Sequence, residues 1–444
     1  MKVVIIGGVA TGMSAAAKFK RSVKEAEVIV FEKGSDVSYA ACGLPYYVSG
    51  TTPELDQLRM RSIEKFAEQG IDVYIKHEVL SVNPEKKMVV VLDLQNDEKF
   101  CQYYDKLVIA TGAVSQKLKV PGADLKNVFT LRSLRDGAVL RKAVSDEKIQ
   151  EVAIVGGGFI GLEMAEAFLL AGKNVRLFAR SKTVLRKYEP EIAEVIEKRL
   201  ADSGVMLQTE ESPVEFVGDE FVQEVVTNKG RYKADLVLLS VGIVPNTEFV
   251  KDIGLEFLSN GAIVVNKKME TNLPDIYAGG DCASVYHKIL GKDVYVPLGT
   301  NANKQGKLIG EVLAGSDKEF GGVLGTSVFK FMDLECGETG MSEAEAREAG
   351  FEVGTSVIDA STHAHYYPGH EPIRIKLVYD VKTRRVLGAS MAGGAGTALR
   401  VSVMVPVIDA GMTIEEVGAL DLGYAPPFSS AWDPIHIAAN AAEK

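Results

Sequence analysis

The sequence predicts an α/β fold in which two doubly wound domains of parallel strands are followed by a smaller α+β domain. A chain of 444 residues is too long for one hydrophobic core, so two or three domains are expected. A buried strand, a glycine turn, a helix and a second strand occur in residues 2–32 and again in residues 152–179. From about residue 325 the pattern changes to a charged helix at 343–349, an alternating, half-buried strand at 373–379 and an apolar helix at 395–411.

Each repeat has the features of a Rossmann-like, dinucleotide-binding βαβ unit. A tight turn between strand and helix lets backbone N–H groups and the helix N-terminus approach a diphosphate closely, and this approach requires glycine. Val9 replaces the middle glycine of the first turn, which is a departure from the usual pattern. The expected contacts are Gly7, Gly8 and Gly12 in the first turn and Gly156, Gly158 and Gly161 in the second.

The residue that ends the second strand of each unit distinguishes the two sites. Glu32 ends the first unit, where a carboxylate can accept hydrogen bonds from the ribose hydroxyls of an adenosine. The second unit has no carboxylate there and continues with Arg180, Ser181 and Lys182. Two cations and a hydroxyl suit a 2′-phosphate, although the cations also suit a solvated surface. We therefore expect this site to accept NADPH as well as NADH.

Composition excludes several classes of protein. Lysine and arginine total 50 against 60 aspartate and glutamate residues, and the formal charge of −10 disfavours sequence-independent binding of nucleic acid. No apolar run is long enough for a signal peptide or a membrane-spanning helix. The four cysteines form neither a CxxC pair nor a metal-binding spacing. We expect a cytoplasmic protein without a membrane partner and without a metal site.

The remaining segments suggest how the domains are connected. Residues 205–240 alternate as short antiparallel strands would, and the strands at 107–112 and 236–242 end in small residues where the chain could cross between domains. We therefore expect one domain at residues 1–112 and 243–322, a second at 113–242 and a third at 323–444. The apolar helix of the third domain needs a partner surface, either within the domain or on another subunit.

The chain resembles the pyridine nucleotide-disulfide oxidoreductases along its whole length, through the two glycine turns, residues 110–112 and residues 271–281. It is most similar to their single-cysteine branch, which contains CoA-disulfide reductases, NADH oxidases and NADH peroxidases. The resemblance implies FAD in the first domain, with Asp281 on its ribityl chain, NAD(P)H in the second, and a homodimer formed by the third. The further cofactor contacts that we expect are Lys33, Thr111, Gly112, Arg132, Ala302, Phe159, Ile160, Tyr188 and Gly242.

The segment 38–47 contains the candidate nucleophile, Cys42. The resemblance implies that this cysteine lies against the flavin at a helix N-terminus, where the helix dipole favours the thiolate. Dithiol relatives have a second cysteine five residues later, but this chain has Tyr47 there, which excludes an internal disulfide. The oxidised form is then a mixed disulfide of Cys42 with a small thiol, or a sulfenic acid.

Two further positions separate disulfide reduction from oxygen chemistry. Oxidases and peroxidases of the branch have a histidine just after the first glycine turn, where this chain has Ala10. The segments 363–369 and 423–428 resemble the tyrosine segments of CoA-disulfide reductases, in which tyrosines of one subunit reach the cysteine of the other. A phenol can protonate a leaving thiolate. Tyr424 is the main candidate, followed by Tyr366 and Tyr367, although all three also suit packing at an interface.

The resemblance makes CoA a candidate ligand, with departures. Ala41 precedes the cysteine where reductases commonly have asparagine, and Asn303 and Trp432 replace a histidine and a lysine. We expect a CoA disulfide, a CoA persulfide or a related small disulfide or polysulfide as substrate. An NADH oxidase or peroxidase using a Cys42 sulfenic acid and a non-catalytic flavin redox sensor remain alternatives. The expected substrate contacts are Ser14, Lys18, Arg21, Ser38, Asn303 and Trp432.

Overall fold

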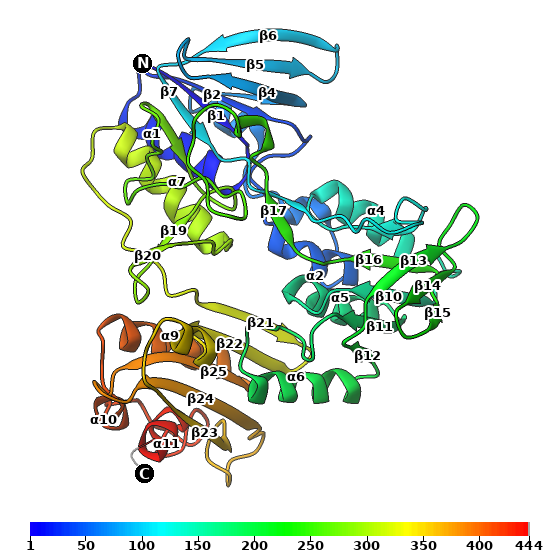
Figure 1. The fold of residues 1–444 in the computed structure, drawn as a ribbon, viewed down its shortest axis with the longest axis vertical. Helices are drawn as coiled ribbons and strands as arrows, with labels where there is room; N and C mark the ends of the chain where they lie inside the picture. The colour runs from blue at the N-terminus through cyan, green and yellow to red at the C-terminus, as the bar shows by residue number, and fades with distance from the viewer. Residues whose placement is uncertain (443–444) are drawn as a thin grey trace.

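The computed structural model describes residues 1–442, so the last two residues of the predicted third domain lie outside the described residues. It contains three five-stranded sheets, two parallel and one antiparallel, each in a separate layer of the molecule (Figure 1). The fold class predicted from the sequence is confirmed. No helix among the described residues is both long and apolar enough to span a membrane.

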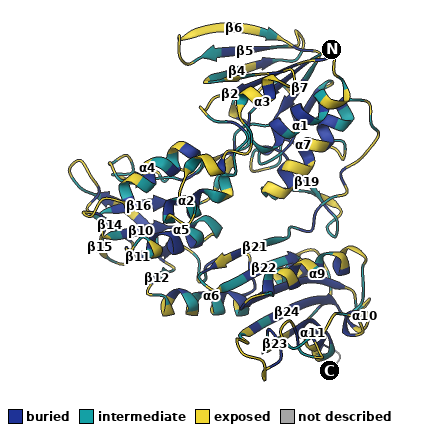
Figure 2. Cartoon of the chain, turned by 180° about the vertical axis from the view of Figure 1, so that it is seen from behind, coloured by how far each residue is buried: buried dark blue, intermediate teal, exposed yellow. Residues whose placement is uncertain are grey.

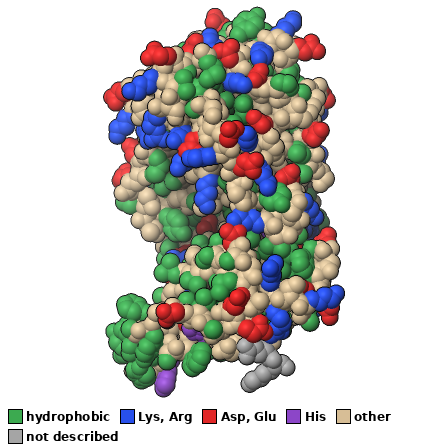
Figure 3. All heavy atoms as spheres, turned by 90° about the vertical axis from the view of Figure 1, so that its left-hand side faces the viewer, with side chains coloured by type: hydrophobic (Ala, Val, Ile, Leu, Met, Phe, Trp, Pro, Cys, Tyr) green, Lys and Arg blue, Asp and Glu red, His purple; other side chains and the backbone are tan. Residues whose placement is uncertain are grey.

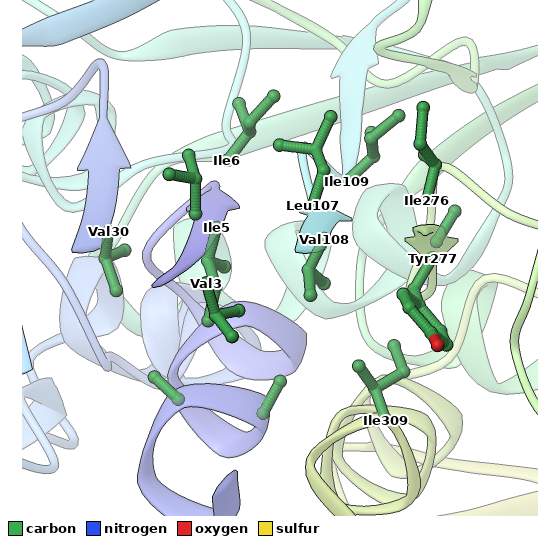
Figure 4. Close-up of a cluster of buried hydrophobic side chains, with 14 of the residues drawn as sticks. Val3, Ile5, Ile6, Val30, Leu107, Val108, Ile109, Ile276, Tyr277 and Ile309 are labelled. Carbon is green, nitrogen blue, oxygen red and sulfur yellow. The ribbon is translucent and has the colours of Figure 1, made fainter. Parts of the chain in front are cut away.

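The strands of the first parallel sheet come from two separate parts of the chain, residues 2–109 and residues 276–278. Its strand order is β18-β7-β1-β2-β3, with bounds Ile276–Ala278, Lys106–Ile109, Lys2–Ile6, Glu27–Glu32 and Ile71–Ile75. Helices α1 (Ala10–Ser22) and α7 (Gly299–Leu313) pack side by side beneath it. The aliphatic side chains of the central strands form a continuous core, which includes Ile309 of α7 (Figure 4). Strand β18 therefore returns late in the sequence to complete a sheet that β1 begins.

An antiparallel meander and two short segments surround this sheet. The meander consists of β4 (His77–Asn83), β5 (Met88–Asp93) and β6 (Glu98–Tyr103), and β6 forms its exposed outer edge (Figure 2). Helix α3 (Ile63–Ala67) packs against β3, and the hairpin of β19 (Val285–His287) and β20 (Lys292–Val294) precedes α7.

The second parallel sheet has the order β12-β11-β10-β16-β9, with bounds Met206–Thr209, Asn174–Ala179, Glu151–Val155, Leu236–Leu239 and Val128–Phe129. Its helices are α4 (Leu134–Val144), α5 (Phe159–Leu170) and α6 (Pro190–Asp202). The prediction of antiparallel strands throughout residues 205–240 is wrong at both ends, since β12 and β16 pair in parallel. Only β13 (Pro213–Val217), β14 (Glu224–Thr227) and β15 (Arg231–Lys233) are antiparallel, because alternation of side chains does not encode strand direction.

Two short strands join the parallel sheets. β8 (Ala113–Ser115) and β17 (Ile243–Pro245) directly follow β7 and β16 and pair with each other in antiparallel fashion. The chain therefore passes from the first parallel sheet to the second and back again at adjacent positions.

The C-terminal sheet has the order β21-β22-β25-β24-β23, with bounds Ser327–Phe331, Leu334–Gly340, Val386–Gly393, Pro372–Asp380 and Val353–Ser361. Helix α9 (Thr397–Asp409) packs on β22 and β25, while α8 (Glu343–Glu348), α10 (Ile414–Gly418) and α11 (Pro434–Ala441) complete the domain. The partner surface of the predicted apolar helix is thus mainly internal, although Leu399 is 74% exposed.

The prediction that strand 373–379 is half buried is wrong. Its alternation is present, because Ile375 and Leu377 face the domain core while Lys376 points the other way. The polar face is covered by the start of α6 from the second domain, which leaves Lys376 only 2% exposed. Its ammonium lies 2.9 to 3.0 Å from the carboxylates of Glu189, Glu191 and Glu343. Burial of this cation is tolerated because three carboxylates compensate its charge.

Candidate active site

Both glycine turns have the backbone geometry that a diphosphate requires. Gly7 and Gly156 have φ angles of 105° and 117°, and a Cβ on either would lie 2.2 or 2.3 Å from a carbonyl oxygen of the neighbouring strand. A Cβ on Gly12 or Gly161 would lie 1.8 or 2.0 Å from the carbonyl oxygen of the turn itself. No larger residue fits these positions without movement of the backbone. In both turns the backbone of the strand and of the helix therefore lies close together, which lets a ligand approach the backbone closely.

The helices that follow these turns begin with free N–H groups. Neither α1 nor α5 has a side-chain cap or an acidic residue in its first turn. In contrast, α4, α8, α10 and α11 all begin with a capping box. Uncapped N–H groups together with the positive end of the helix dipole bind phosphate. Gly8 and Gly158 lie in these turns, and a Cβ on Gly158 would meet only open space, so a ligand can lie against it.

Glu32 lies beside the first turn, as predicted. Its carboxylate accepts hydrogen bonds from the backbone N–H groups of Gly8 and Gly34, both at 2.7 Å. Lys33 points away and pairs with Glu78 at 2.7 Å. The two hydrogen bonds, one to each carboxylate oxygen, therefore fix the orientation of Glu32. Lys33 is engaged in an ion pair.

A second group of predicted cofactor residues meets at the junction of β7 and the chain after β18. The Arg132 guanidinium donates to the Asp281 carboxylate at 2.7 Å and to the carbonyl oxygen of Ala113 at 3.1 Å. The Thr111 hydroxyl donates to the carbonyl oxygen of Asn246 at 2.7 Å. Four other members of the predicted set lie at strand ends or in helices of the two parallel sheets: Gly112 follows β7, Ala302 lies in α7, Gly242 follows β16 and Ile160 lies in α5.

Cys42 is exposed and unpaired, in a short 3-10 turn at residues 41–43 that leads into α2 (Leu44–Ser49). The expectation that a helix N-terminus favours its thiolate stays a prediction. The protein atoms around the sulfur desolvate it, which raises the pKa of Cys42, and the charges of Glu163 and Asp281 raise it further, while Arg132 opposes them.

Glu163 and Tyr46 belong to this site and were missed from the sequence. Both line a small pocket between α2 and α5, together with Glu166. Burial raises the pKa of Glu163 to about 7, and the neighbouring Glu166 contributes to the increase. Both glutamates lie on α5 beyond the glycine turn, where the sequence shows only an ordinary helix with acidic residues, so no local signal could have identified them.

Replacing Glu163 should change the reactivity of Cys42. Above pH 7 its carboxylate becomes charged and opposes thiolate formation, so Glu163→Gln should lower the pKa of Cys42. The pH dependence of Cys42 alkylation by iodoacetamide, measured in a Cys101→Ser background, should shift towards lower pH. The exposed Glu194 provides a control, since Glu194→Gln should leave the profile unchanged. An unshifted profile in Glu163→Gln would show that the two groups do not interact.

Phe159 and Tyr188 form an aromatic cluster with Phe329 of the C-terminal domain. The ring centroids of Phe159 lie 5.9 Å from Tyr188 and 5.5 Å from Phe329. Tyr188 is only 4% exposed, and its hydroxyl lies 3.2 Å from that of Ser327. Burial raises its pKa well above the usual value. The structure therefore places Tyr188 behind Phe159 rather than at an open surface, because β21 of the C-terminal domain covers it.

The predicted tyrosines lie on two loops of the C-terminal domain. Tyr366 follows β23, Tyr424 follows α10, and their hydroxyl oxygens are 2.9 Å apart. Tyr367 packs its ring 5.6 Å from that of His363 and does not join this pair. Tyr366 and Tyr424 are 64% and 51% exposed. Figure 3 shows one projecting corner of the molecule where hydrophobic and histidine side chains gather.

Within one chain, the tyrosine loops are far from Cys42. Figure 1 shows α2 beside α5 in the middle of the molecule, whereas β23 and α10 lie at the far end of the C-terminal domain. The hydrogen bonds that Tyr366 and Tyr424 make do not involve any residue of α2. A tyrosine can therefore act on Cys42 only if it comes from a second subunit.

The predicted substrate residues fall into two groups. Ser14 donates to the Asn303 side chain at 3.1 Å, and Lys18 and Arg21 follow on the same face of α1. The Lys18 ammonium is already paired with Glu311 at 3.0 Å, so it would have to exchange this partner for a phosphate. Ser38 has a φ of 49° near the first glycine turn, where its N–H donates to the carbonyl oxygen of Gly8. Trp432 lies apart from these, 60% exposed on the C-terminal domain.

Comparison with known proteins places the whole chain in one family. Residues 1–306 match the model of the pyridine nucleotide-disulphide oxidoreductases, and residues 326–435 match the dimerisation domain of the same family. The chain is 43% identical over 439 residues to a CoA-dependent NAD(P)H sulfur oxidoreductase of Pyrococcus furiosus, which covers 99% of this chain and 98% of the relative. It is 30% identical to a coenzyme A disulfide reductase of Staphylococcus aureus, with 98% of both chains covered.

Solved structures agree with this assignment. An NAD-dependent persulfide reductase from A. fulgidus has a TM-score of 0.96 and 37% identity, over all of this chain and 83% of that one. A water-forming NADPH oxidase, engineered from the Lactobacillus brevis NADH oxidase and bound to NADPH, has a TM-score of 0.96 and 30% identity, over 100% and 98% of the two chains. The resemblance seen in the sequence is therefore confirmed, and the chain belongs to the pyridine nucleotide-disulphide oxidoreductase family, whose members use FAD and NAD(P)H.

Proposed function

We propose that this enzyme uses NADPH to reduce a CoA-type disulfide or persulfide at Cys42, with a tyrosine of a second subunit as proton donor. In this proposal residues 1–112 and 243–322 bind FAD, residues 113–242 bind NAD(P)H, and residues 323–444 form a homodimer. We place the enzyme in the cytoplasm, where free thiols persist, because all four cysteines of the described chain are unpaired.

The observation that carries the proposal is the isolation of Cys42. It is exposed beside Arg132 and Asp281, and Tyr47 stands where a second cysteine would be needed for an internal disulfide. Cys282 and Cys336 are buried, and Cys101 lies on the outer strand β6. A lone, exposed cysteine can exchange with an external disulfide but cannot form an internal one. The substrate must therefore supply the second sulfur.

The reaction balances with one external disulfide, RSSR. The Cys42 thiolate attacks one sulfur of RSSR, a Cys42–S–S–R bond forms, and RS⁻ leaves and takes a proton from the tyrosine. FAD, held by residues such as Glu32 and Asp281, would supply the two-electron link between NADPH and this mixed disulfide. The Cys42 sulfur and the second RS group each take up one electron, which regenerates the thiolate and releases a second RSH once a proton is added. The sum is NADPH + H⁺ + RSSR → NADP⁺ + 2 RSH.

The preference for NADPH rests on the loop after β11. The engineered NADPH oxidase carries substitutions that place alanine, arginine and serine in consecutive positions and a second arginine five residues after the serine. This chain has Ala179, Arg180 and Ser181 at the end of β11, and Arg186 five residues later. Arg180 and Arg186 are both exposed, so both can reach a 2′-phosphate.

Removing both arginines should change the preferred nucleotide. In Arg180→Ala/Arg186→Ala, we expect the KM for NADPH to rise about 10- to 100-fold, which corresponds to about 1.5–3 kcal/mol for a lost charge-assisted hydrogen bond. The KM for NADH should change by less than about twofold, since NADH has no 2′-phosphate. Lys198→Ala, which removes an exposed cation of α6, is the control. Equal losses with both nucleotides would refute the assignment of this loop.

The substrate class is tested by comparing acceptors without oxygen. Under anaerobic conditions, NADPH oxidation should be fastest with CoA disulfide or a CoA persulfide and much slower with glutathione disulfide, because α1 and α7 offer polar groups for a nucleotide-containing thiol. NADPH consumption that requires oxygen, and is not accelerated by any disulfide, would instead identify an oxidase. Oxidase chemistry finds less support here, since Ala10 opens α1 where a histidine would be required.

A further inference from the structure

Arg400 lies beneath the two tyrosine loops and is almost completely buried. It belongs to α9, at a position where the helix faces the loop 362–371 between β23 and β24 and the loop 420–433 between α10 and α11. Its guanidinium pairs with Asp433, with the Nη2 and Oδ2 atoms 2.9 Å apart, and the two side chains are 9% and 10% exposed. Arginine is suited to such a position because its planar group donates in several fixed directions at once.

The same guanidinium binds the backbone of both loops. Its Nη2 donates to the carbonyl oxygen of Thr362 at 2.8 Å and to that of Phe428 at 3.1 Å. These two carbonyl groups cannot hydrogen-bond to each other, because both are acceptors. Their own N–H groups are used elsewhere: that of Thr362 donates to Glu371 and that of Phe428 to Ala425. The loops can be joined at this level only through an external donor, which Arg400 supplies.

From this level the two loops run antiparallel in constant register. Two residues after Thr362 and two residues before Phe428, the N–H of Ala364 donates to the carbonyl oxygen of Pro426 at 3.3 Å. Another two residues after Ala364 and before Pro426, the hydroxyl oxygens of Tyr366 and Tyr424 lie 2.9 Å apart. Neither loop has strand hydrogen bonds along this stretch, and Pro426 and Pro427 cannot donate any. The register therefore rests on three cross-links among the described residues, and the Arg400 guanidinium makes the one that joins both loops to α9.

The second loop is also fixed on its far side. Asp433 accepts from the Ser429 hydroxyl at 2.8 Å and from the N–H of Ile435 at 2.9 Å, which caps α11. His436 of α11 bonds the carbonyl oxygen of Leu420 at 2.8 Å, at the start of the loop. Burial alone would raise the pKa of Asp433, but Arg400 and these donors hold it below its usual value. The carboxylate is therefore charged and keeps the guanidinium in place.

We propose that Arg400 is a positioning residue for the tyrosine pair: held by Asp433, it fixes the register of both loops and so keeps Tyr366 and Tyr424 in contact. This inference rests on the proposed function, in which the phenol protonates a leaving thiolate. It adds a requirement that the proposed function does not contain, namely that proton donation depends on a buried cation of the same subunit as the tyrosines.

The first test measures loop order and does not depend on activity. Arg400→Lys keeps the positive charge beside Asp433 but cannot reach both carbonyl oxygens and the carboxylate together. Hydrogen-deuterium exchange of the intact holoenzyme should become at least about fivefold faster in peptides from both loops, and remain unchanged in β24 and α9. Asp433→Asn should loosen the same peptides. Arg384→Lys, which alters the Arg384–Glu415 pair of the same domain, is the matched control.

The second test is a double-mutant cycle on the disulfide half-reaction. Arg400→Lys should lower kcat with CoA disulfide at least about tenfold, while the rate of flavin reduction by NADPH stays the same. In a Tyr424→Phe background, Arg400→Lys should have less than about a twofold further effect, because the group that it positions is absent. Multiplicative effects of the two substitutions, or unchanged exchange in both loops, would overturn the positioning role. Full activity of Tyr424→Phe alone would refute the proposed proton donor, while the exchange data would still decide whether Arg400 holds the loops.

Discussion

Replacing Cys42 by serine is expected to abolish disulfide reduction, with a loss of at least about a thousandfold in turnover. A serine hydroxyl at this position can neither exchange with a disulfide nor accept two electrons as a mixed disulfide. The glycine turns and the Arg132–Asp281 pair do not involve the sulfur, so FAD should remain bound. NADPH should still bleach the flavin absorbance, because α5 and the loop after β11 are unchanged.

The measurement compares two rates in the same preparation. Stopped-flow absorbance gives the rate of flavin reduction by NADPH, and steady-state assays give the rate with CoA disulfide. Cys101→Ser provides the matched control, since Cys101 is also exposed and free but lies on β6 of the meander. If Cys42→Ser retained more than about a tenth of the disulfide activity, the sulfur of Cys42 would not be on the electron path.

Replacing Tyr424 by phenylalanine is expected to lower kcat with disulfide substrates by about a hundredfold, the size of a general-acid contribution. The hydroxyl oxygens of Tyr366 and Tyr424 lie 2.9 Å apart, and either hydroxyl could be the donor. In the proposed arrangement Tyr366 donates to the Tyr424 oxygen, and the Tyr424 hydroxyl keeps its own proton for the leaving thiolate. Tyr366→Phe should therefore have a smaller effect than Tyr424→Phe.

Substrates with different leaving groups identify the step that Tyr424 supports. If the phenol protonates the leaving thiolate, the loss in Tyr424→Phe should shrink for disulfides whose thiols have a low pKa, because such thiolates leave without a proton. Tyr103→Phe, at an exposed tyrosine of β6, serves as the control. A loss of the same size for every leaving group would mean that Tyr424 packs against the substrate instead of protonating it.

The parts of the molecule that the sequence predicted are those in which one residue type is required locally. Gly7, Gly12, Gly156 and Gly161 are fixed by close contacts with carbonyl oxygens, and such a requirement is visible in the sequence of a single chain. The fold class followed from these turns and from the strands that flank them. The tyrosines could be singled out only by resemblance, but their direct contact was not predictable, since 58 residues separate them.

The parts that the sequence did not predict depend on contacts between distant segments. Tyr188 is buried because β21 of the C-terminal domain covers it, and Lys376 is buried because α6 covers its strand. Glu163 acquires its raised pKa from α2 packing against α5. Arg400 lies in a helix expected to be apolar, and its partner Asp433 lies 33 residues away. In each case the local sequence is ordinary and the environment is made by tertiary packing.

The intact mass of the protein after reaction with its substrate is the most direct test of the proposed role of Cys42. The enzyme is reduced with NADPH without oxygen, treated with CoA disulfide and separated from small molecules. Its mass is then measured by mass spectrometry before and after addition of a thiol reductant. We expect a gain of one CoA moiety per chain, located on the peptide that contains Cys42, absent from Cys42→Ser and removed by the reductant. An unmodified mass, or a gain of oxygen alone, would contradict the claim that Cys42 takes up one half of the substrate as a mixed disulfide.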